Sequence, residues 1–280
     1  MAIKVVTDTG CDLPASLLEA YDIHTVPLIL RLGDEEMLDT ETSREELWHH
    51  LDAGLPFQTS GPPVGAYEAV YRPLVEAGHE VVCIALTGAH SVTYSSAWAA
   101  AQSFGDRISV FDSCSLSLGY GLLTLEAARL AADGADRDTI MAAMEEMRGR
   151  LQVRFFLENL DQIQRGGRLA ALMPVIKRLG RTLNIRAILI LDDEGRITLM
   201  GPARGRRGAI RRLINEAVAD GPLEQAVVGH VRRPDEALAM ADTLATRSGL
   251  PRDQILVIEL GAVFVAHAGD GILGVGTIAR

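Results

Sequence analysis

The sequence predicts an α/β fold, and three observations favour this class. Short apolar, β-branched runs alternate with longer helical stretches, the pattern of a parallel or mixed sheet covered by helices. Hydrophobic residues make up 48% of the sequence and charged residues 23%, a balance typical of a globular chain rather than a disordered one. The length of 280 residues is sufficient for one large domain or two ordinary ones. We therefore expect a globular α/β protein.

The first half of the chain contains the expected parallel sheet. Four apolar runs predict its strands: IKVVT, HTVPLIL, EVVCIALT and ISVF. The segment SREEL predicts a capping box in which Ser43 and Glu46 begin a helix. Two alanine-rich helices are expected at about 115–133 and 137–150. Residues 1–150 are therefore predicted to form an N-terminal α/β domain with a parallel sheet.

The composition changes over residues 151–184, where the chain becomes basic and is interrupted by glycines. We place the domain boundary at the start of this segment, so that residues 151–280 form a second α/β domain. Within it, IRAILILDDEGRITLM predicts a hairpin with Asp193, Glu194 and Gly195 at the turn. The later stretch GAVFVAHAGDGILGVG resembles an apolar strand that leads His267 into a glycine-rich turn.

Charge, cysteine content and hydropathy exclude several classes. The net charge of −10 argues against a nucleic-acid-binding protein or a general membrane-surface protein, since both need a broad basic face. The three cysteines form no CxxC pair, which favours small core residues in a reducing compartment over a disulfide framework or a metal site. The N-terminus runs directly into a strand, and no apolar stretch has the length of a membrane span. We expect a cytoplasmic protein without integral membrane contact.

Polar side chains follow three strands of the predicted sheet where each strand ends. In a parallel sheet these ends share one edge, where ligands bind and helix N-termini offer free N–H donors. The alternative is ordinary helix capping by the same residue types. The residues are Thr7, Asp8, Thr9, Thr87, Ser91, Thr93, Asp112, Ser113 and Ser115.

Three further positions are candidates for ligand binding. Thr59 and Ser60 precede a proline-rich turn, although Ser-Gly-Pro clusters also mark turns without function. Arg168 follows two glycines, which suits a guanidinium that binds a carboxylate or phosphate, or alternatively a helix end with a surface arginine. His267 is either a ligand contact or a structural histidine. His49 and His50 are adjacent in a helix and cannot share a metal, so no metal site is expected.

Seven stretches occur in the order and spacing of the DegV family: TDTGCDLP, TSGPP, SVTYSSA, FDS, LDQIQRGGRLA, ARGRRGAI and GAVFVAHAGDGILGVG. The chain resembles this family, whose members act as the fatty-acid-binding FakB subunit of bacterial fatty acid kinase. The resemblance implies a two-domain DegV-like fold with an acyl chain buried between the domains and no cofactor besides this bound ligand. It also implies that Thr59, Ser91, Arg168 and His267 hold the carboxylate, and we assign the adjacent Ser60 to the same site.

Several residues depart from the family pattern. Thr9 replaces the serine of TDS, Gly88 a serine, Pro63 a serine, and Arg186-Ala187 a Lys-Pro pair. Family members usually have glycine where this chain has Val92. A β-branched residue does not readily adopt positive φ, so we expect the backbone beside Ser91 to follow a different path.

The sequence predicts a lipid-binding subunit rather than an enzyme. It contains no GxxxxGK[ST] motif, and no GxGxxG opens a helix after the first strand, so the ATP-dependent kinase is expected to be a separate partner. The alternative is a serine hydrolase or thioesterase with Ser91 as nucleophile and His267 as base, but the chain has no GxSxG motif. In the basic stretch GPARGRRGAIRR we expect Arg204 and Arg206 to dock the kinase; the alternative is a solvated helix start.

Overall fold

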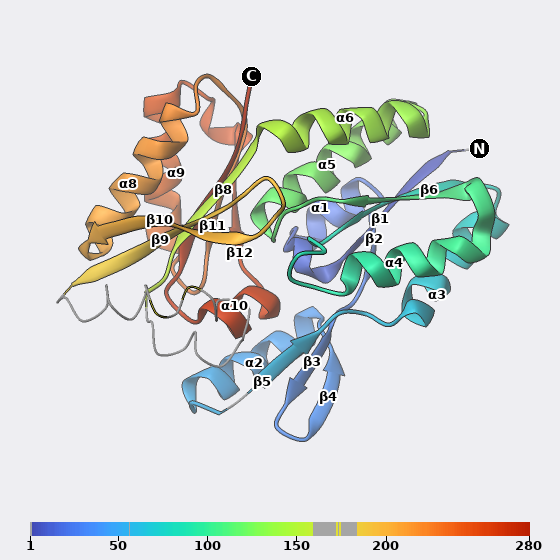
Figure 1. The fold of residues 1–280 in the computed structure, drawn as a ribbon, viewed down its shortest axis with the longest axis horizontal. Coiled ribbons are helices and arrows are strands. Elements are labelled where there is room, and N and C mark those ends of the chain that lie inside the picture. Colours follow the sequence, from blue (N-terminus) through green and yellow to red (C-terminus); the bar gives the residue numbers. More distant parts are fainter. Residues whose placement is uncertain (1, 56, 159–171, 173, 175–183) are drawn as a thin grey trace. The chain divides into compact units, whose positions relative to one another are not determined.

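The computed structural model describes residues 2–55, 57–158, 172, 174 and 184–280. The chain divides into two compact units, Met1–Gly149 and Arg150–Arg280. Each unit combines a β-sheet with helices that cover it, as Figure 1 shows, and the predicted α/β class is confirmed.

The first unit contains a parallel sheet of four strands in the order β2-β1-β6-β7. The predicted run HTVPLIL does not form one strand, because its two halves enter different sheets on either side of Pro27. Proline has no backbone N–H and cannot continue a hydrogen-bonded ladder. The strands are β1 (Ile3–Asp8), β2 (His24–Val26), β6 (Glu80–Ala85) and β7 (Ile108–Asp112).

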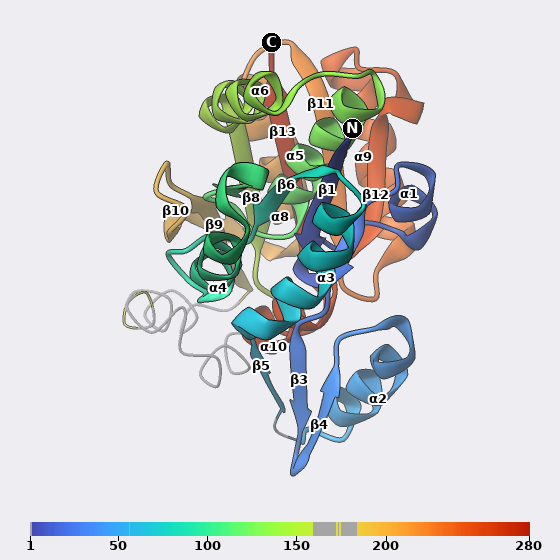
Figure 2. The same ribbon diagram turned by 90° about the vertical axis from the view of Figure 1, so that its right-hand side faces the viewer.

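Helices cover both faces of this sheet (Figures 1 and 2). Helices α3 (Val64–Glu76) and α4 (Thr93–Ala101) pack together on one face, whereas α5 (Leu118–Ala132) contacts β1 and β6 on the other. Alternate strand residues point toward α3 and α4, because successive side chains of a strand face opposite ways. The core on this face includes Val6, Val26, Tyr67, Tyr71, Val81, Cys83, Ala97 and Ala100.

A smaller antiparallel sheet completes the first unit, in the order β4-β3-β5. Helix α2 (Glu41–Asp52), which lies between β4 and β5 in the chain, starts earlier than predicted: Thr40 is its N-cap, and the Thr40 N–H donates to Ser43 Oγ at 2.9 Å. The predicted Ser43–Glu46 capping box is therefore wrong, and Ser43 is the third helical residue. The remaining elements of this unit are β3 (Ile29–Leu32), β4 (Glu35–Leu38), β5 (Phe57–Ser60), α1 (Ala15–Ala20), α6 (Arg137–Arg150) and two short 3₁₀ turns, Thr9–Cys11 and Gln102–Arg107.

The second unit contains a mixed sheet of six strands in the order β10-β9-β8-β13-β11-β12. Helices α8 (Gly205–Ala219) and α9 (Pro234–Ser248) pack on each other and on this sheet, and their apolar side chains form its core. A 3₁₀ turn, Arg252–Gln254, precedes β12. The strands are β8 (Leu151–Phe156), β9 (Ile185–Leu191), β10 (Ile197–Arg204), β11 (Leu223–His230), β12 (Ile255–Glu259) and β13 (Leu273–Ala279).

Two sequence predictions for this unit have different outcomes. The hairpin is confirmed, since β9 and β10 are antiparallel and Gly195 adopts φ +74° in the turn between them. The strand predicted to lead into His267 is wrong, because Ala262–Ala268 form helix α10 and the strand begins only at Leu273. A short apolar run has no periodicity that separates a buried helix from a buried strand.

Two predicted helices in the first unit are present, although α5 begins at Leu118 rather than near residue 115. No helix in the part of the chain that the structure describes is long and apolar enough to cross a membrane.

Candidate functional site

The carboxyl ends of β1, β6 and β7 meet at one edge of the parallel sheet, as the sequence predicted. Several hydroxyl groups at this edge donate hydrogen bonds to backbone carbonyl groups. Thr7 Oγ1 donates to the carbonyl of Ile84 at 2.9 Å, and Ser113 Oγ donates to the carbonyl of Ser115 at 3.3 Å. These bonds fix the backbone of a strand and a loop and do not cap a helix, and ligand binding at this edge stays a prediction.

Asp8 is the buried charged group of this edge. One carboxylate oxygen, Oδ1, accepts hydrogen bonds from the Tyr120 hydroxyl at 2.7 Å and from the Gly10 N–H at 3.0 Å. The other, Oδ2, accepts from the Leu86 N–H at 3.3 Å. Burial raises the pKa of Asp8 from 3.8 to about 6 and outweighs these hydrogen bonds, which lower it. Asp8 thereby joins the end of β1, the loop after β6 and helix α5.

Thr9 carries a hydroxyl group at the position where the family pattern has serine. Its Oγ1 donates to Asp39 Oδ2 at 2.9 Å and accepts from the Leu28 N–H at 3.1 Å. Neither Asp39 nor Tyr120 was identified as a partner from the sequence. The Tyr120–Asp8 pair spans 112 residues, and no local sequence signal marks it.

Ser91 lies at the start of α4 and is half-buried. Its Oγ lies 2.5 Å from Thr93 Oγ1, with either hydroxyl able to donate, and it accepts from the Thr93 N–H at 3.2 Å. Val92 adopts φ −78° and ψ −2°, which any residue can adopt. Valine is therefore unstrained here, and a backbone path different from that of relatives with glycine stays a prediction.

Thr59 and Ser60 lie at the end of β5, where they pair with Leu30 and Ile29 of β3. The adjacent Gly61 lies against the start of α4. A Cβ on Gly61 would lie 2.9 Å from Thr93 Oγ1 and 3.2 Å from Val92 Cγ2. The TSG segment (residues 59–61) and the SVT segment (residues 91–93) are thus in contact, which places the two predicted hydroxyl-bearing segments side by side.

The remaining predicted ligand residues lie elsewhere in the chain. His267 belongs to the second unit, where it lies half-buried in the last turn of α10. Arg168 lies outside the residues that the structure describes. Thr59, Ser60 and Ser91 belong to the two segments that meet at Gly61 and Thr93.

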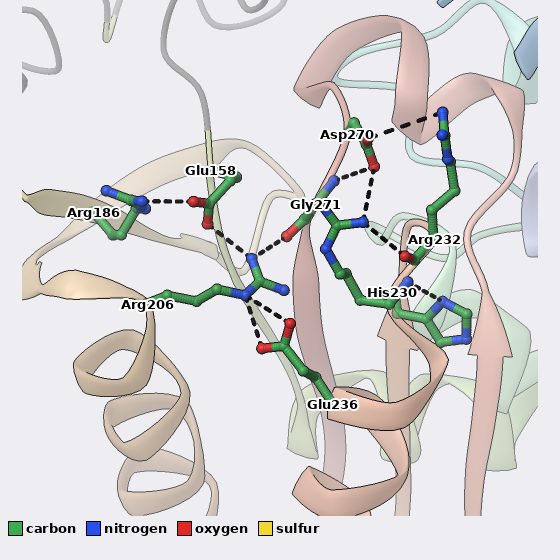
Figure 3. A network of polar contacts seen from close by, with 9 residues as sticks. Glu158, Arg186, Arg206, His230, Arg232, Glu236, Asp270 and Gly271 are labelled. Carbon is green, nitrogen blue, oxygen red and sulfur yellow. Dashed lines mark hydrogen bonds and ion pairs between the residues drawn. The ribbon is translucent and has the colours of Figure 1, made fainter. Parts of the chain in front are cut away.

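The basic stretch consists of two kinds of arginine. Arg204, Arg207 and Arg211 are exposed. Arg206 binds Glu158 and Glu236, and Arg212 donates to the carbonyl of Pro202 at 2.7 Å, so both make internal contacts in the second unit. Figure 3 shows Arg206 between its two carboxylates. Arg204 is thus accessible in the way a docking residue requires, whereas Arg206 has a place within the fold that the sequence did not indicate.

Two chemical alternatives gain no support from these contacts. Among the residues that the structure describes, no group of three or more His, Cys, Asp or Glu side chains is arranged to hold a metal ion. The contact of Ser91 Oγ is a threonine hydroxyl rather than a base, so it does not resemble an activated nucleophile.

Comparisons with known proteins agree with these features. Residues 2–280 match the family described as "Uncharacterised protein, DegV family". Protein DegV from Bacillus subtilis is 34% identical over 286 residues, covering 98% of both chains, and a DegV domain-containing protein from Streptomyces coelicolor is 33% identical over 279 residues, covering 98% of this chain and 97% of that protein.

Two solved structures have the same fold over the full length of both chains. A DegV family protein from Thermus thermophilus, described as binding fatty acid, has a TM-score of 0.89 at 30% identity. DegV from Bacillus subtilis, described as a fatty acid binding protein, has a TM-score of 0.82 at 31% identity. The chain therefore belongs to the DegV family.

Proposed function

We propose that this protein binds a long-chain fatty acid and that the SVT and TSG segments supply hydroxyl ligands for its carboxylate. The observation that carries the proposal is the contact of these two segments at Gly61 and Thr93. It gathers the hydroxyl-bearing segments at the first turn of α4, where free N–H groups and the helix dipole favour a negative charge. The fatty-acid-binding relatives with the same fold support the same ligand class.

Burial of the acyl chain supplies most of the expected affinity. Each buried CH₂ contributes about 0.8 kcal/mol, so about sixteen carbons contribute on the order of 10 kcal/mol before the cost of ordering the ligand. The carboxylate then needs few contacts, and a charge-assisted hydrogen bond contributes about 1.5 to 3 kcal/mol. The polar groups therefore set the head-group preference more than the overall affinity.

The head-group assignment is tested with Ser91→Ala and a matched control, Ser95→Ala. Ser95 lies on the same helix, is exposed, and donates to the carbonyl of Val92 at 2.8 Å. Ser91→Ala should weaken palmitate binding about tenfold or more and binding of hexadecanol much less, because the alcohol carries no charge. Ser95→Ala should change neither affinity. Equal losses for acid and alcohol in Ser91→Ala would contradict the assignment.

Arg168 and His267 are proposed to complete the carboxylate site, as the family resemblance implies. Arg168→Ala should weaken binding of the acid more than binding of the alcohol, because only the acid uses the guanidinium charge. His267→Ala should leave the thermal midpoint near that of the native protein while it impairs a reaction at the carboxyl. Unfolding of His267→Ala would favour the structural interpretation of this histidine.

We further propose that the bound carboxyl is presented to a separate ATP-dependent kinase. The kinase would transfer the γ-phosphoryl group of ATP to a carboxylate oxygen, which gives an acyl phosphate and ADP. Support comes from the sequence, which contains no GxxxxGK[ST] motif, and from the exposed Arg204, Arg207 and Arg211 on a chain of net charge −10. Exposed arginines can steer an acidic partner surface and hold phosphoryl oxygens.

The docking proposal is tested with Arg204→Glu combined with Arg207→Glu. Arg206 is left unchanged, because its contacts with Glu158 and Glu236 belong to the fold. Arg31→Glu combined with Arg196→Glu is the control, since it makes the same charge change at arginines that are 57% and 63% exposed. The first pair should abolish ATP turnover with the cognate kinase and leave palmitate affinity unchanged, and the control should affect neither. Unchanged ATP turnover in the Arg204→Glu, Arg207→Glu variant would mean that these arginines are ordinary solvated surface residues.

A further inference from the structure

We infer that Arg206 is a positioning residue for His267, an inference that rests on the proposed contact between His267 and the fatty-acid carboxylate. Arg206 lies in the first turn of α8, and its guanidinium is one-fifth exposed. Figure 3 shows this guanidinium at the centre of a polar network of the second unit. The network reaches the turn that follows the His267 helix.

Two nitrogens of Arg206 bond to three different segments of the second unit. Nε donates to the Glu236 carboxylate of α9 at 2.8 and 3.0 Å. Nη1 donates to Glu158 Oε2, just after β8, at 2.8 Å and to the carbonyl oxygen of Gly271 at 2.5 Å. The guanidinium also lies 5.2 Å from the centre of the Phe156 ring. A planar fork of fixed donors can satisfy these partners at once, which a lysine ammonium cannot.

Gly271 belongs to the short turn between α10 and β13. The Gly269 N–H donates to the carbonyl of Val265 at 2.9 Å at the beginning of this turn, and the Val231 N–H donates to the carbonyl of Ile272 at 3.0 Å at its end. Arg206 holds the carbonyl between these two points. Since His267 lies two residues before Gly269, the position of the turn sets where the last turn of α10 ends.

Close packing leaves the turn little freedom. Gly271 adopts φ +77°, and a Cβ at this position would lie 3.1 Å from Glu158 Cγ and 3.2 Å from Glu158 Cβ. Glu158 is itself fixed by Arg186 at 2.5 Å. A movement of Gly271 would therefore have to displace Glu158 or break the bond to Arg206.

The charges around Arg206 explain why replacing this residue would change the position of the Gly271 turn. Burial raises the pKa of Glu158, but hydrogen bonds from Arg186 and Arg206 outweigh this effect and hold the pKa below its usual value. Without Arg206, Glu158 and Glu236 lose the cation that they share. The Glu158 side chain would then lose one of the bonds that fix its position. Because it packs directly against Gly271, a shift of Glu158 would also shift this turn.

Arg212 provides a matched control on the same helix. Its side chain is 29% exposed, against 20% for Arg206. It donates to the carbonyl of Pro202 at 2.7 Å and contacts Glu216 at 3.4 Å. The first contact joins α8 to β10 and the second lies within α8, so neither involves the turn that follows α10. Arg206 and Arg212 thus make similar bonds but hold different segments.

The experiment measures palmitate affinity for Arg206→Lys and Arg212→Lys, each in the native background and in a His267→Ala background. Arg206→Lys should weaken binding about tenfold in the native background and less than about twofold in the His267→Ala background, because coupled residues lose affinity non-additively. Arg212→Lys should change affinity less than about twofold in both backgrounds. Thermal melting checks that all variants are folded.

Each outcome decides a separate question. If the native protein binds no palmitate, the proposed function fails. If the native protein binds but Arg206→Lys has the same effect with and without His267, or no effect, the positioning role is overturned while fatty-acid binding stands. Should Arg206→Lys not fold, Glu236→Gln keeps the guanidinium and weakens its anchoring, and its loss of affinity must likewise depend on His267.

Discussion

Asp8 is a carboxyl group with no solvent exposure that nevertheless receives three hydrogen bonds. A sequence pattern can place an acidic residue at the end of a strand, and TDTG did so here. It could not identify the Tyr120 hydroxyl or the Leu86 N–H as donors, because these residues lie 112 and 78 positions further along the chain. The balance between burial and hydrogen bonding follows from the three-dimensional arrangement alone.

We expect Asp8 to make the stability of the protein pH-dependent. Its pKa is about 6 in the folded protein and near 3.8 in the unfolded chain, so the folded state binds the proton more tightly between these values. The free energy of unfolding should therefore fall as pH rises from about 4 to about 6, by on the order of 3 kcal/mol from this residue.

Urea unfolding of the native protein and Asp8→Asn at each pH isolates this contribution. The stability of the native protein relative to Asp8→Asn should decrease over the interval, because asparagine does not titrate. A constant relative stability would contradict the raised pKa and mean that burial and hydrogen bonding cancel, and a rise would mean that the hydrogen bonds dominate and favour the ionised carboxylate.

Gly271 and Gly249 separate two costs of adding a side chain. Both adopt positive φ, +77° and +75°, but only Gly271 has Glu158 atoms within 3.2 Å of the added Cβ. Gly249→Ala should cost about 1 to 2 kcal/mol of unfolding free energy from the left-handed backbone alone. Gly271→Ala should cost more, because it also displaces the side chain that holds Arg206. Equal losses in urea unfolding would show that the turn can yield without strain.

At the level of elements, local sequence patterns predicted the structure correctly where a pattern is typical of only one kind of element. The hairpin of β9 and β10 was predictable because a turn sequence lies between two apolar runs. Helix α10 was not, because AVFVAHA is apolar apart from His267 and short enough for a strand. The run HTVPLIL was predicted as one strand although it contains Pro27. The proline is itself a signal that a strand ends, and the prediction did not use it.

The start of α2 gives an element-scale prediction. Ser43 is buried and accepts from the Thr40 N–H, whereas Glu46 is exposed. Ser43→Ala should lower the free energy of unfolding by about 1 kcal/mol, as removal of a capping contact typically does. Glu46→Ala should change it by less than about 0.5 kcal/mol. A larger loss in Glu46→Ala, measured by urea unfolding, would support the capping box first expected from the sequence.

At the scale of the whole molecule, the family and fold class followed from motifs spread over the full chain, and the fold was confirmed. The candidate site was only partly predictable. The TSG and SVT segments were found from residue types, but their contact depends on the approach of Gly61, just after β5, to the start of α4. The Arg206 contacts lie 30, 48 and 65 residues apart in sequence, so a basic stretch gave no indication that one of its arginines is internal.

Fatty-acid binding is the central claim, and mass spectrometry of freshly purified protein tests it most directly. The mass under native conditions should exceed the mass under denaturing conditions by that of one long-chain fatty acid, because an acyl chain bound with on the order of 10 kcal/mol survives purification. Added palmitate or oleate should exchange with this ligand. Identical native and denatured masses, together with no binding of added palmitate or oleate, would contradict the account.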